Sequence, residues 1–465
     1  MGRLFGTDGV RGVANTELTP ELAVGLGRAV VRTLREEGRA RPRFVVGRDP
    51  RASGEMLEAA LVAGFCSAGG DVVPLGVLPT PGVAYLTTRF GTDGGAMLSA
   101  SHNPVGDNGI KFFGADGYKL TDDEEQRIEE LLQRSDEDRP TGAAIGRVRP
   151  LPDAIESYVE HLVAAAEADL SGLRLVVDCA HGAAYRVAPE VLRRLGAEVV
   201  AINASPTGEN INDRCGSTHP QGLVDAVVEH GADAGLAHDG DADRLIAVDH
   251  GGEIVDGDAI LAILVARLQR TRGLDSVVTT VMTNLGFKQA MERLGVRVVE
   301  TKVGDRYVLE TMRAGGHLLG GEQSGHIIFA DHATTGDGVL TAVKLLSVVA
   351  AEGRPLRDLA RVMRRLPQVL VNVGDVDRRR LDHADQLWQA VAAEEAALAG
   401  SGRVLVRASG TEPLVRVMVE ADSEARASEV AGRLAAVVAA EVSETPGLVD
   451  DRTSGVQKST DPGVF

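Results

Sequence analysis

Short apolar runs alternate with longer amphipathic segments along most of the chain. PRFVVGRD at 42–49 and DVVPLGV at 71–77 predict buried strands, and ASGEMLEAALVAGFCSAG at 52–69 predicts a helix between them. Short apolar runs bounded by turn residues are typical of buried strands, and their alternation with helical segments is typical of α/β units. The pattern therefore predicts an α/β protein.

The same rhythm repeats and divides the chain into successive domains. A predicted capping box at Thr121 and Glu124 starts a polar segment that ends in a break near 140–155. A second unit begins near LRLVVDCAHGAA and a third near DGDAILAILVARL, whereas the last strands alternate with two alanine-rich helices. We expect domains at 1–150, 151–255, 256–365 and 366–444. The polar segment 445–465 is expected to be a disordered tail.

The amino-acid composition indicates which kinds of binding partner and which cellular compartment to expect. Lys and Arg total 49 against 67 Asp and Glu, a net charge of −18, which argues against a nucleic-acid or anionic-membrane surface. No apolar run is long enough to span a bilayer, and the N-terminus has no apolar signal region. Cys66, Cys179 and Cys215 are widely spaced and lack a CxxC pair, which excludes a zinc or disulfide framework. The sequence predicts a cytoplasmic protein.

Three carboxylates alternate in AHDGDADRL, at Asp239, Asp241 and Asp243. An EF-hand would need glycine and glutamate where Arg244 and His250 stand, and the spacing of a dehalogenase-type phosphatase is also absent. Carboxylates this close repel unless a cation lies between them, and oxygen ligands favour magnesium or calcium over zinc. The stretch predicts a divalent-metal loop with room for a further anionic ligand; the alternative is a solvated acidic turn.

Two other stretches offer groups that bind phosphate or a polyol. VRASGTEPLVRVMVE supplies guanidinium groups, hydroxyls and a glycine-containing loop, the parts of a phosphate site, although it could be a hairpin turn alone. No Walker motif occurs. In GGEQSGHIIF, polar side chains alternate at Glu322, Ser324 and His326. If this run is extended they share one face and can contact a polyol; the alternative is a plain hairpin. Lys111, in DNGIKFF, is either a surface cation or a catalytic group.

SASHNP, at 99–104, contains two serines beside a histidine, without the GxSxG pattern of a nucleophile elbow. A serine in such a small-residue turn can instead carry a phosphoryl group. Phosphoserine is dianionic and offers strong oxygen ligands, so it could complete the metal site of the aspartate loop.

Five motifs, in this order, resemble the α-D-phosphohexomutase family: FGTDGVRG, SASHNPVGDNGIKFF, DGDADR, GEQSGH and RASGTEP. The resemblance implies three successive α/β domains of mixed sheets and a smaller C-terminal α+β domain, heart-shaped with a central active-site cleft. It also implies an isomerase that transfers a phosphoryl group within a sugar phosphate. FGTDGVRG, KVGDRYV at 302–308 and the glutamine of GEQSGH are similar to members that act on glucosamine phosphate. The alternative is mannose or glucose phosphate.

The resemblance also implies a role for each candidate residue. Residues at the reacting phosphoryl group or in proton transfer would be Ser101, Lys111, His326, Arg11, Arg244 and His102. Sugar contacts would be Gly304, Asp305, Glu322 and Ser324, and the non-reacting phosphate would contact Arg407, Ser409, Gly410, Thr411 and Arg416. One Mg²⁺ per chain would be bound by phosphoserine 101 with Asp239, Asp241 and Asp243.

The implied reaction interconverts glucosamine 6-phosphate and glucosamine 1-phosphate. Phosphoserine 101 would phosphorylate O1, and the resulting 1,6-bisphosphate would turn end over end and return its 6-phosphate to the serine. The product would supply UDP-N-acetylglucosamine and cell-wall precursor synthesis. Two other classes of function are a sugar-phosphate sensor without turnover and a magnesium-dependent phosphatase. The sequence leaves the oligomeric state open.

Overall fold

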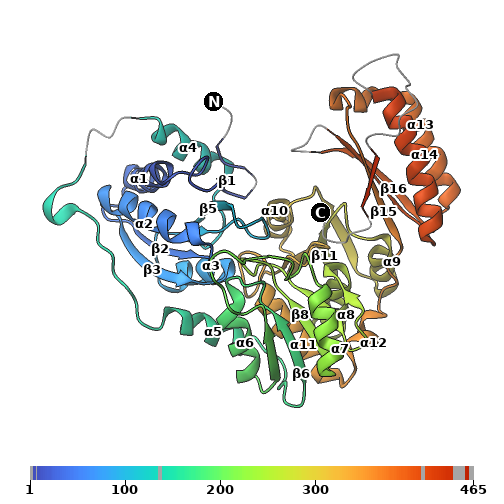
Figure 1. The fold of residues 1–465 in the computed structure, drawn as a ribbon, viewed down its shortest axis with the longest axis horizontal. Helices are drawn as coiled ribbons and strands as arrows, with labels where there is room; N and C mark the ends of the chain where they lie inside the picture. Colours follow the sequence, from blue (N-terminus) through green and yellow to red (C-terminus); the bar gives the residue numbers. More distant parts are fainter. Residues whose placement is uncertain (1–3, 7, 135–138, 410–413, 443–455, 460–465) are drawn as a thin grey trace. The chain divides into compact units, whose positions relative to one another are not determined.

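The computed structural model describes residues 4–6, 8–134, 139–409, 414–442 and 456–459 (Figure 1). By its internal contacts the chain divides into two compact units. The larger one comprises Met1–Met282 and Leu294–Val362, and the smaller one comprises Thr283–Arg293 and Met363–Phe465.

The larger unit contains three sheets in chain order, each covered by helices. The first sheet has the order β1-β5-β4-β2-β3, and its strands are β1 Val10–Val13, β2 Arg43–Arg48, β3 Asp71–Val77, β4 Gly94–Leu98 and β5 Asp107–Gly114. Its helices are α1 Pro20–Glu36, α2 Ala52–Ser67, α3 Thr80–Arg89 and α4 Asp122–Leu132. The apolar faces of α1 and α2 pack with the first sheet in one core that includes Leu26, Leu61 and Phe65.

The second and third sheets follow the same plan. The second has the order β10-β9-β8-β6-β7, with strands β6 Arg174–Asp178, β7 Glu198–Ile202, β8 Ala234–Ala237, β9 Ile246–Asp249 and β10 Ile254–Val255, and helices α5 Ala154–Ala164, α6 Ala184–Arg194 and α7 Gln221–His230. The third has the order β12-β11-β13-β14, with strands β11 Ser276–Thr280, β12 Arg297–Thr301, β13 Leu319–Gly321 and β14 Ile327–Phe329, and helices α8 Gly257–Arg272, α10 Asp305–Gly315, α11 Gly338–Glu352 and α12 Leu356–Ala360.

A four-strand arrangement repeats in all three sheets. The runs β3-β2-β4-β5, β7-β6-β8-β9 and β12-β11-β13-β14 each contain two parallel pairs and then one antiparallel pair. The connection inside the antiparallel pair is SASHNPVG at 99–106 in the first sheet, the aspartate loop at 238–245 in the second and EQSGH at 322–326 in the third. Three of the predicted motifs therefore occupy the same topological position in three successive domains.

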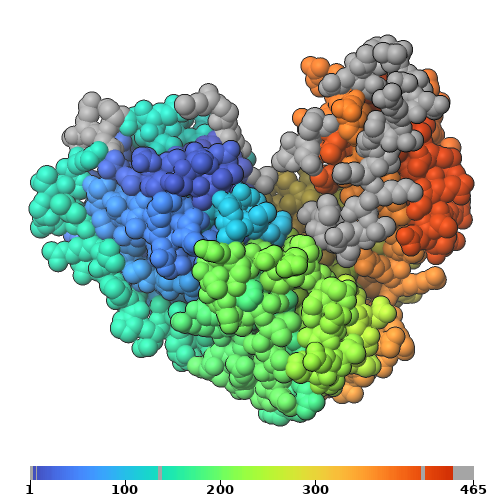
Figure 2. All heavy atoms as spheres, in the orientation of Figure 1, coloured from blue at the N-terminus to red at the C-terminus, as the bar shows by residue number. Residues whose placement is uncertain are grey.

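The predicted α/β organisation is confirmed within these sheets. The helix expected at 52–69 is α2, and the predicted strands at 42–49 and 71–77 are β2 and β3. Thr121 forms the predicted capping box with Glu124 at the start of α4. In Figure 2 the cyan atoms of the first domain meet the green atoms of the second, in agreement with a 2.9 Å hydrogen bond from Asn212 Nδ2 to the Ser101 carbonyl.

The smaller unit is a four-stranded sheet with the order β16-β17-β15-β18, with its pairs antiparallel. Its strands are β15 Gln368–Val373, β16 Arg403–Ala408, β17 Val415–Glu420 and β18 Val456–Ser459, and its long helices are α13 Asp385–Leu398 and α14 Glu424–Val442. Valines of the sheet and alanines and leucines of both helices form one core. The start of α9 (Leu285–Leu294) joins this unit, because the Asn284 side chain bonds the Leu366 backbone at 3.0 Å.

The structure describes four residues of the segment 445–465, which is expected to be a disordered tail. Val456–Ser459 form strand β18, which pairs with β15 in the register Val373↔Val456 to Leu370↔Ser459. The backbone edge of β15 explains this pairing, because an open strand edge is a template for a further extended segment.

Candidate active site

The serine loop and the aspartate loop meet in the larger unit. Ser101 is buried, and its Oγ donates a 2.6 Å hydrogen bond to Asp239 Oδ2. The backbone of Ser101 has φ 51°, in the left-handed region that residues other than glycine seldom adopt. Such a conformation persists only where the surroundings enforce it. The serine that the motif resemblance selects is therefore the one that faces the carboxylates.

A buried ion pair between Arg51 and Asp49 supports the serine loop at 99–106. Arg51 is fully buried, donates at 2.9 Å to Asp49 Oδ2, and directs its other nitrogens at four carbonyls of the loop. Those carbonyls belong to Ser101 at 2.9 Å, Asn103 at 2.8 Å, Asp107 at 3.1 Å and Pro104. Ser99 Oγ donates to Asp49 at 2.6 Å and accepts from the Ser101 N–H at 2.9 Å. Ser99 is thus part of the support of the loop.

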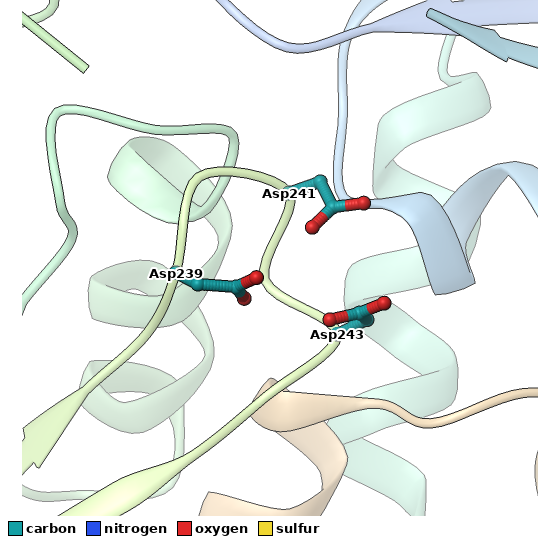
Figure 3. A group of neighbouring side chains, drawn as sticks. All are labelled: Asp239, Asp241 and Asp243. Carbon is teal, nitrogen blue, oxygen red and sulfur yellow. The ribbon is translucent and has the colours of Figure 1, made fainter. Parts of the chain in front are cut away.

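Figure 3 shows the carboxylates of Asp239, Asp241 and Asp243 turned toward one another from one loop. All three are buried, and one ligand atom from each lies within 4.8 Å of the others. Among the residues that the structure describes, Oδ1 of Asp241 and Oδ1 of Asp243 are buried without a hydrogen-bond partner. Buried oxygens of this kind are costly unless a cation contacts them, so the donor set fits a hard divalent metal.

The pKa shifts show how strongly these carboxylates interact. Burial, together with the charges of Asp243 and Asp241, raises the pKa of Asp239 well above its usual value. Burial and Asp241 likewise raise the pKa of Asp243. Burial acts to raise the pKa of Asp241 as well, but the charge of Lys111 together with hydrogen bonds from Thr80 and Lys111 outweighs it and lowers that pKa. The triad therefore gathers more negative charge than the neighbouring cations offset.

Lys111 lies inside the site, so the alternative interpretation of this residue as a surface cation is wrong. It projects from β5, is almost fully buried, and places Nζ 3.0 Å from Asp241 and 2.9 Å from Asp8. Burial alone would lower its pKa, but the two carboxylates raise it above the usual value. Lys111 is therefore a protonated group beside the aspartate loop, able to donate a proton or to stabilise a negative oxygen.

The EQSGH stretch is a tight turn and not an extended strand, which corrects one of the two expectations. The Gly325 N–H donates to the Glu322 carbonyl at 3.0 Å, and Glu322 N–H donates to the His326 carbonyl at 3.0 Å. Gly325 has φ 89°, which suits glycine and closes the turn. The plain-hairpin alternative is therefore correct for the backbone, while the side chains still gather at the site.

The residues of this turn and of the segment before α10 lie together. The Gly304 N–H donates at 3.1 Å to Glu322 Oε1. His326 Nε2 lies 3.7 Å from Asp305 Oδ2 and 3.8 Å from Asp243 Oδ2. Both ring nitrogens of His326 and the hydroxyl of Ser324 are buried, and none of them forms a hydrogen bond within the described part of the chain. These groups are available to a ligand.

The two predicted arginines contact aspartates of the site, and His102 lies beside the serine hydroxyl. Arg11 donates to Asp8, and Arg244 Nε lies 3.8 Å from Asp243 Oδ1. His102 Nδ1 lies 3.4 Å from Ser101 Oγ, and burial together with the charges of Arg244 and Arg11 lowers its pKa to about 3. His102 is therefore neutral and a weak base.

The predicted phosphate contacts lie in the smaller unit. Arg407 on β16 and Arg416 on β17 are direct partners in the antiparallel register, so their side chains share one face. Burial and the charge of Arg416 lower the pKa of Arg407, as expected where cations are gathered. Arg378 donates to the carbonyl of Ser409. Gly410 and Thr411 lie outside the described residues.

Several residues of the site were not predicted. Asp8 lies inside the FGTDGVRG motif, and Arg51 follows strand β2 in GRDPR, where a cation directly after a buried strand is a weak signal. Lys119 carries no sequence signal. Gln323 is the glutamine of GEQSGH, one of the residues on which the expectation of a glucosamine phosphate substrate rests. Its side chain donates at 3.4 Å to Asp256, the N-cap residue of α8. The structure thus gives Gln323 a contact with the start of a helix.

Comparison with known families finds the family that the five motifs resemble. Four domains of the phosphoglucomutase/phosphomannomutase family match this chain. The α/β/α domains I, II and III match residues 2–139, 156–252 and 256–366, and the C-terminal domain matches residues 370–437. The chain therefore belongs to the phosphoglucomutase/phosphomannomutase family, the α-D-phosphohexomutases. The predicted family, its four-domain α/β organisation and the isomerase class are confirmed.

Two relatives that match this chain over nearly its whole length have higher sequence identity to it than the two solved structures compared with it. The phosphoglucosamine mutase of Symbiobacterium thermophilum is 59% identical over 95% of this chain and 100% of the relative, and that of Streptomyces griseus is 60% identical over 94% and 99%. Among solved structures, a family protein of Burkholderia thailandensis has TM-score 0.80 and 26% identity over 94% of this chain and 97% of that one. A putative phosphomannomutase of Thermus thermophilus has TM-score 0.72 and 28% identity over 94% and 97%.

Proposed function

We propose that this chain interconverts glucosamine 6-phosphate and glucosamine 1-phosphate, with Ser101 as the phosphoryl carrier. The observation that carries the proposal is the contact of Ser101 Oγ with Asp239, in a cluster of buried carboxylates that fits a cation. The names of the full-length relatives support glucosamine phosphate over mannose or glucose phosphate as the substrate.

The metal in this proposal is Mg²⁺. Asp239, Asp241 and Asp243, together with the phosphate on Ser101, would hold it, since magnesium prefers oxygen ligands and bound phosphate. When bound, the ion neutralises charge on the transferring phosphoryl group. No nitrogen or sulfur ligand is present in this cluster of described residues, which favours magnesium over zinc.

The protein's own side chains position the sugar and handle its protons. Lys111, held protonated by two carboxylates, donates a hydrogen bond or a proton to the reacting sugar oxygen. His326, with both ring nitrogens available, exchanges a proton with the sugar hydroxyl. Arg11 and Arg244 stabilise negative charge on the phosphoryl oxygens, and the neutral His102 shapes the serine loop.

The remaining predicted residues bind the parts of the substrate that do not react. Glu322 and Ser324 accept or donate hydrogen bonds at sugar hydroxyls, and the segment at Gly304 and Asp305 selects the sugar. Guanidinium groups pair well with phosphate oxygens, so the arginines of the smaller unit would hold the non-reacting phosphate. The phosphate-binding residues in this proposal are Arg407, Ser409, Gly410, Thr411 and Arg416.

The substrate is tested with the purified, phosphorylated protein and the 6-phosphates of glucosamine, glucose and mannose. We expect kcat/KM for glucosamine 6-phosphate to exceed the other two by at least about tenfold, because a site built to contact the 2-amino group loses part of that interaction when a 2-hydroxyl takes its place. A preference for mannose or glucose would support the alternative substrate. Phosphate release faster than isomerisation would support a phosphatase, and binding without turnover would support a sensor.

Removal of one carboxylate of the triad is expected to weaken metal binding and activity together. We expect Asp243→Asn to lower the affinity for Mn²⁺, a spectroscopic substitute for Mg²⁺, at least about tenfold and kcat about 100-fold. Electron paramagnetic resonance measures the binding of Mn²⁺ independently of turnover. Asp213→Asn, an exposed aspartate on another loop, is the control and should bind Mn²⁺ as the unmodified protein does. Equal Mn²⁺ affinity in both variants would remove Asp243 from the metal site.

The proposal places the enzyme in the cytoplasm. Cys66, Cys179 and Cys215 are all free thiols, which suits a reducing compartment. Among the described residues, the helices lack the length and apolar character needed to cross a membrane. The partner in the proposal is a hexosamine phosphate, and the acidic net charge of −18 disfavours nucleic acid.

A further inference from the structure

One carboxylate, that of Asp8, holds three cations of the candidate site. It forms an ion pair with Lys111 Nζ at 2.9 Å and accepts hydrogen bonds from Lys119 Nζ at 2.5 Å and from Arg11. Cations this close repel one another unless a negative group lies between them. The charges of Lys111, Lys119 and Arg11 outweigh the effect of burial and hold the pKa of Asp8 well below its usual value, so Asp8 is ionised. Asp8 therefore keeps these cations together.

Lys119 extends this arrangement to the third domain. Its backbone forms a bridge with Phe113 of β5, while its ammonium also donates to Asp305 Oδ2 at the first residue of α10. The side chain is only 9% exposed. Burial acts to lower the pKa of Lys119, but Asp305 and Asp8 outweigh it and raise the pKa. A charged lysine thus lies between two carboxylates that belong to different domains.

Each of these carboxylates contacts a group that the proposed reaction uses. Asp8 contacts Lys111 on the side of the first domain, and Asp305 Oδ2 lies 3.7 Å from His326 Nε2 on the side of the third. Lys119 is the cation that the two carboxylates share. Without it, two partly buried negative groups would face one another, and their repulsion would be stronger than between groups in open solvent.

We propose that Lys119 is a positioning residue: it fixes Asp8 and Asp305, and through them sets the separation of Lys111 and His326. This inference rests on the proposed function, because it gives Lys119 a role in holding the two proton-transfer groups at the sugar. Reacting groups must be held to within about an ångström, since a shift of this size can cost about 100-fold in rate.

Other contacts dock α10 on the first domain without Lys119. Arg306 donates at 2.9 Å to the Leu120 carbonyl and at 2.8 Å to Glu125, and Arg313 lies 3.9 Å from the ring centre of Tyr118. These contacts hold the helix against the first domain, whereas Lys119 contacts the carboxylates of the site. Removal of Lys119 is therefore expected to disturb the site more than the docking of the helix.

The test compares Lys119→Met, Lys119→Arg and the control Arg313→Met, all in the full chain. We expect Lys119→Met to lower kcat about 100-fold with a change in KM of less than about threefold, a split typical of lost positioning. Lys119→Arg, which can bridge both carboxylates, should recover kcat to within about tenfold of the unmodified enzyme. Arg313→Met removes a half-exposed cation that lies between α10 and residues 116–118, next to Lys119 in the sequence, and should retain kcat within about twofold.

Each outcome separates this inference from the proposed function. Unmodified protein that does not isomerise glucosamine phosphates would overturn the proposed function itself. An active unmodified enzyme with an equally active Lys119→Met would overturn only the role of Lys119. If Lys119→Met does not fold, as judged by circular dichroism, Lys119→Gln takes its place: it keeps two hydrogen-bond donors without the charge. A fall in kcat in Lys119→Gln supports the inference, and an unchanged kcat contradicts it.

Discussion

Replacement of Ser101 by alanine is expected to abolish isomerisation while the protein still binds sugar phosphate. The hydroxyl is the phosphoryl carrier in the proposed reaction, and no neighbouring hydroxyl can replace it, because Ser99 Oγ is engaged with Asp49 and the backbone. We expect kcat to fall at least about 1,000-fold, since loss of a covalent carrier removes the whole pathway. Coupled assays of glucosamine 1-phosphate formation measure the rate, and calorimetry with glucosamine 6-phosphate measures binding.

Site mapping by mass spectrometry gives the direct control for this prediction. The unmodified protein should carry one phosphate in the peptide that contains residues 99–104, and fragmentation should place it on Ser101. A phosphate on Ser99 would contradict the assignment, as would full activity of Ser101→Ala. The structure favours Ser101, because its Oγ faces Asp239 whereas Ser99 Oγ faces Asp49.

The chemistry carried by contiguous residues was predictable from the sequence. Asp239, Asp241 and Asp243 are separated by single residues, and the apolar runs before and after them become β8 and β9, so one loop had to gather them. SASHNP was predictable in the same way, as a turn between β4 and β5. Local pattern predicts such loops because each lies between two neighbouring antiparallel strands.

Contacts across long stretches of chain were not predictable. Lys119 meets Asp305 across 186 residues, and although Asp305 belongs to the KVGDRYV motif, nothing in either segment points to the other residue. Lys111 was equally consistent with a surface position until the fold placed Asp8 and Asp241 against it. Periodicity shows which residues are buried and reports nothing about which distant charges face one another.

The alternation of polar residues at 322–326 suggested an extended strand, which the structure does not form. Glu322, Ser324 and His326 alternate as they would on one face of a strand, yet Gly325 with φ 89° turns the backbone between them. The glycine was the signal, because a single glycine inside an apparent strand often marks a turn or bulge. The repeated topology of the three sheets explains why a turn is required there: it is the connection that SASHNP and the aspartate loop form in the other two.

Replacement of Arg51 by methionine is expected to cost the most stability of any change described for this chain. Arg51 is fully buried and donates to Asp49 and to four carbonyls of the serine loop, so its removal leaves a buried carboxylate without its cation. Loss of one partner of a buried pair costs about 3–5 kcal/mol. The left-handed conformation of Ser101 would lose its support as well. Hydrogen exchange of the peptide that spans residues 99–110, followed by mass spectrometry, measures the local loss of protection.

Arg48→Met is the matched control for this prediction. Arg48 lies at the end of the same strand, β2, but pairs with Glu55 and Glu58 on α2 and does not contact the serine loop. Its loss should cost about 1 kcal/mol or less, the range of ion pairs near the surface. Arg51→Lys separates charge from geometry: it keeps the cation beside Asp49 but cannot reach four carbonyls at once. We therefore expect it to fold, with loop protection and kcat both between those of the unmodified enzyme and Arg51→Met. Unchanged exchange of the loop in Arg51→Met would show that this guanidinium does not hold Ser101 in place.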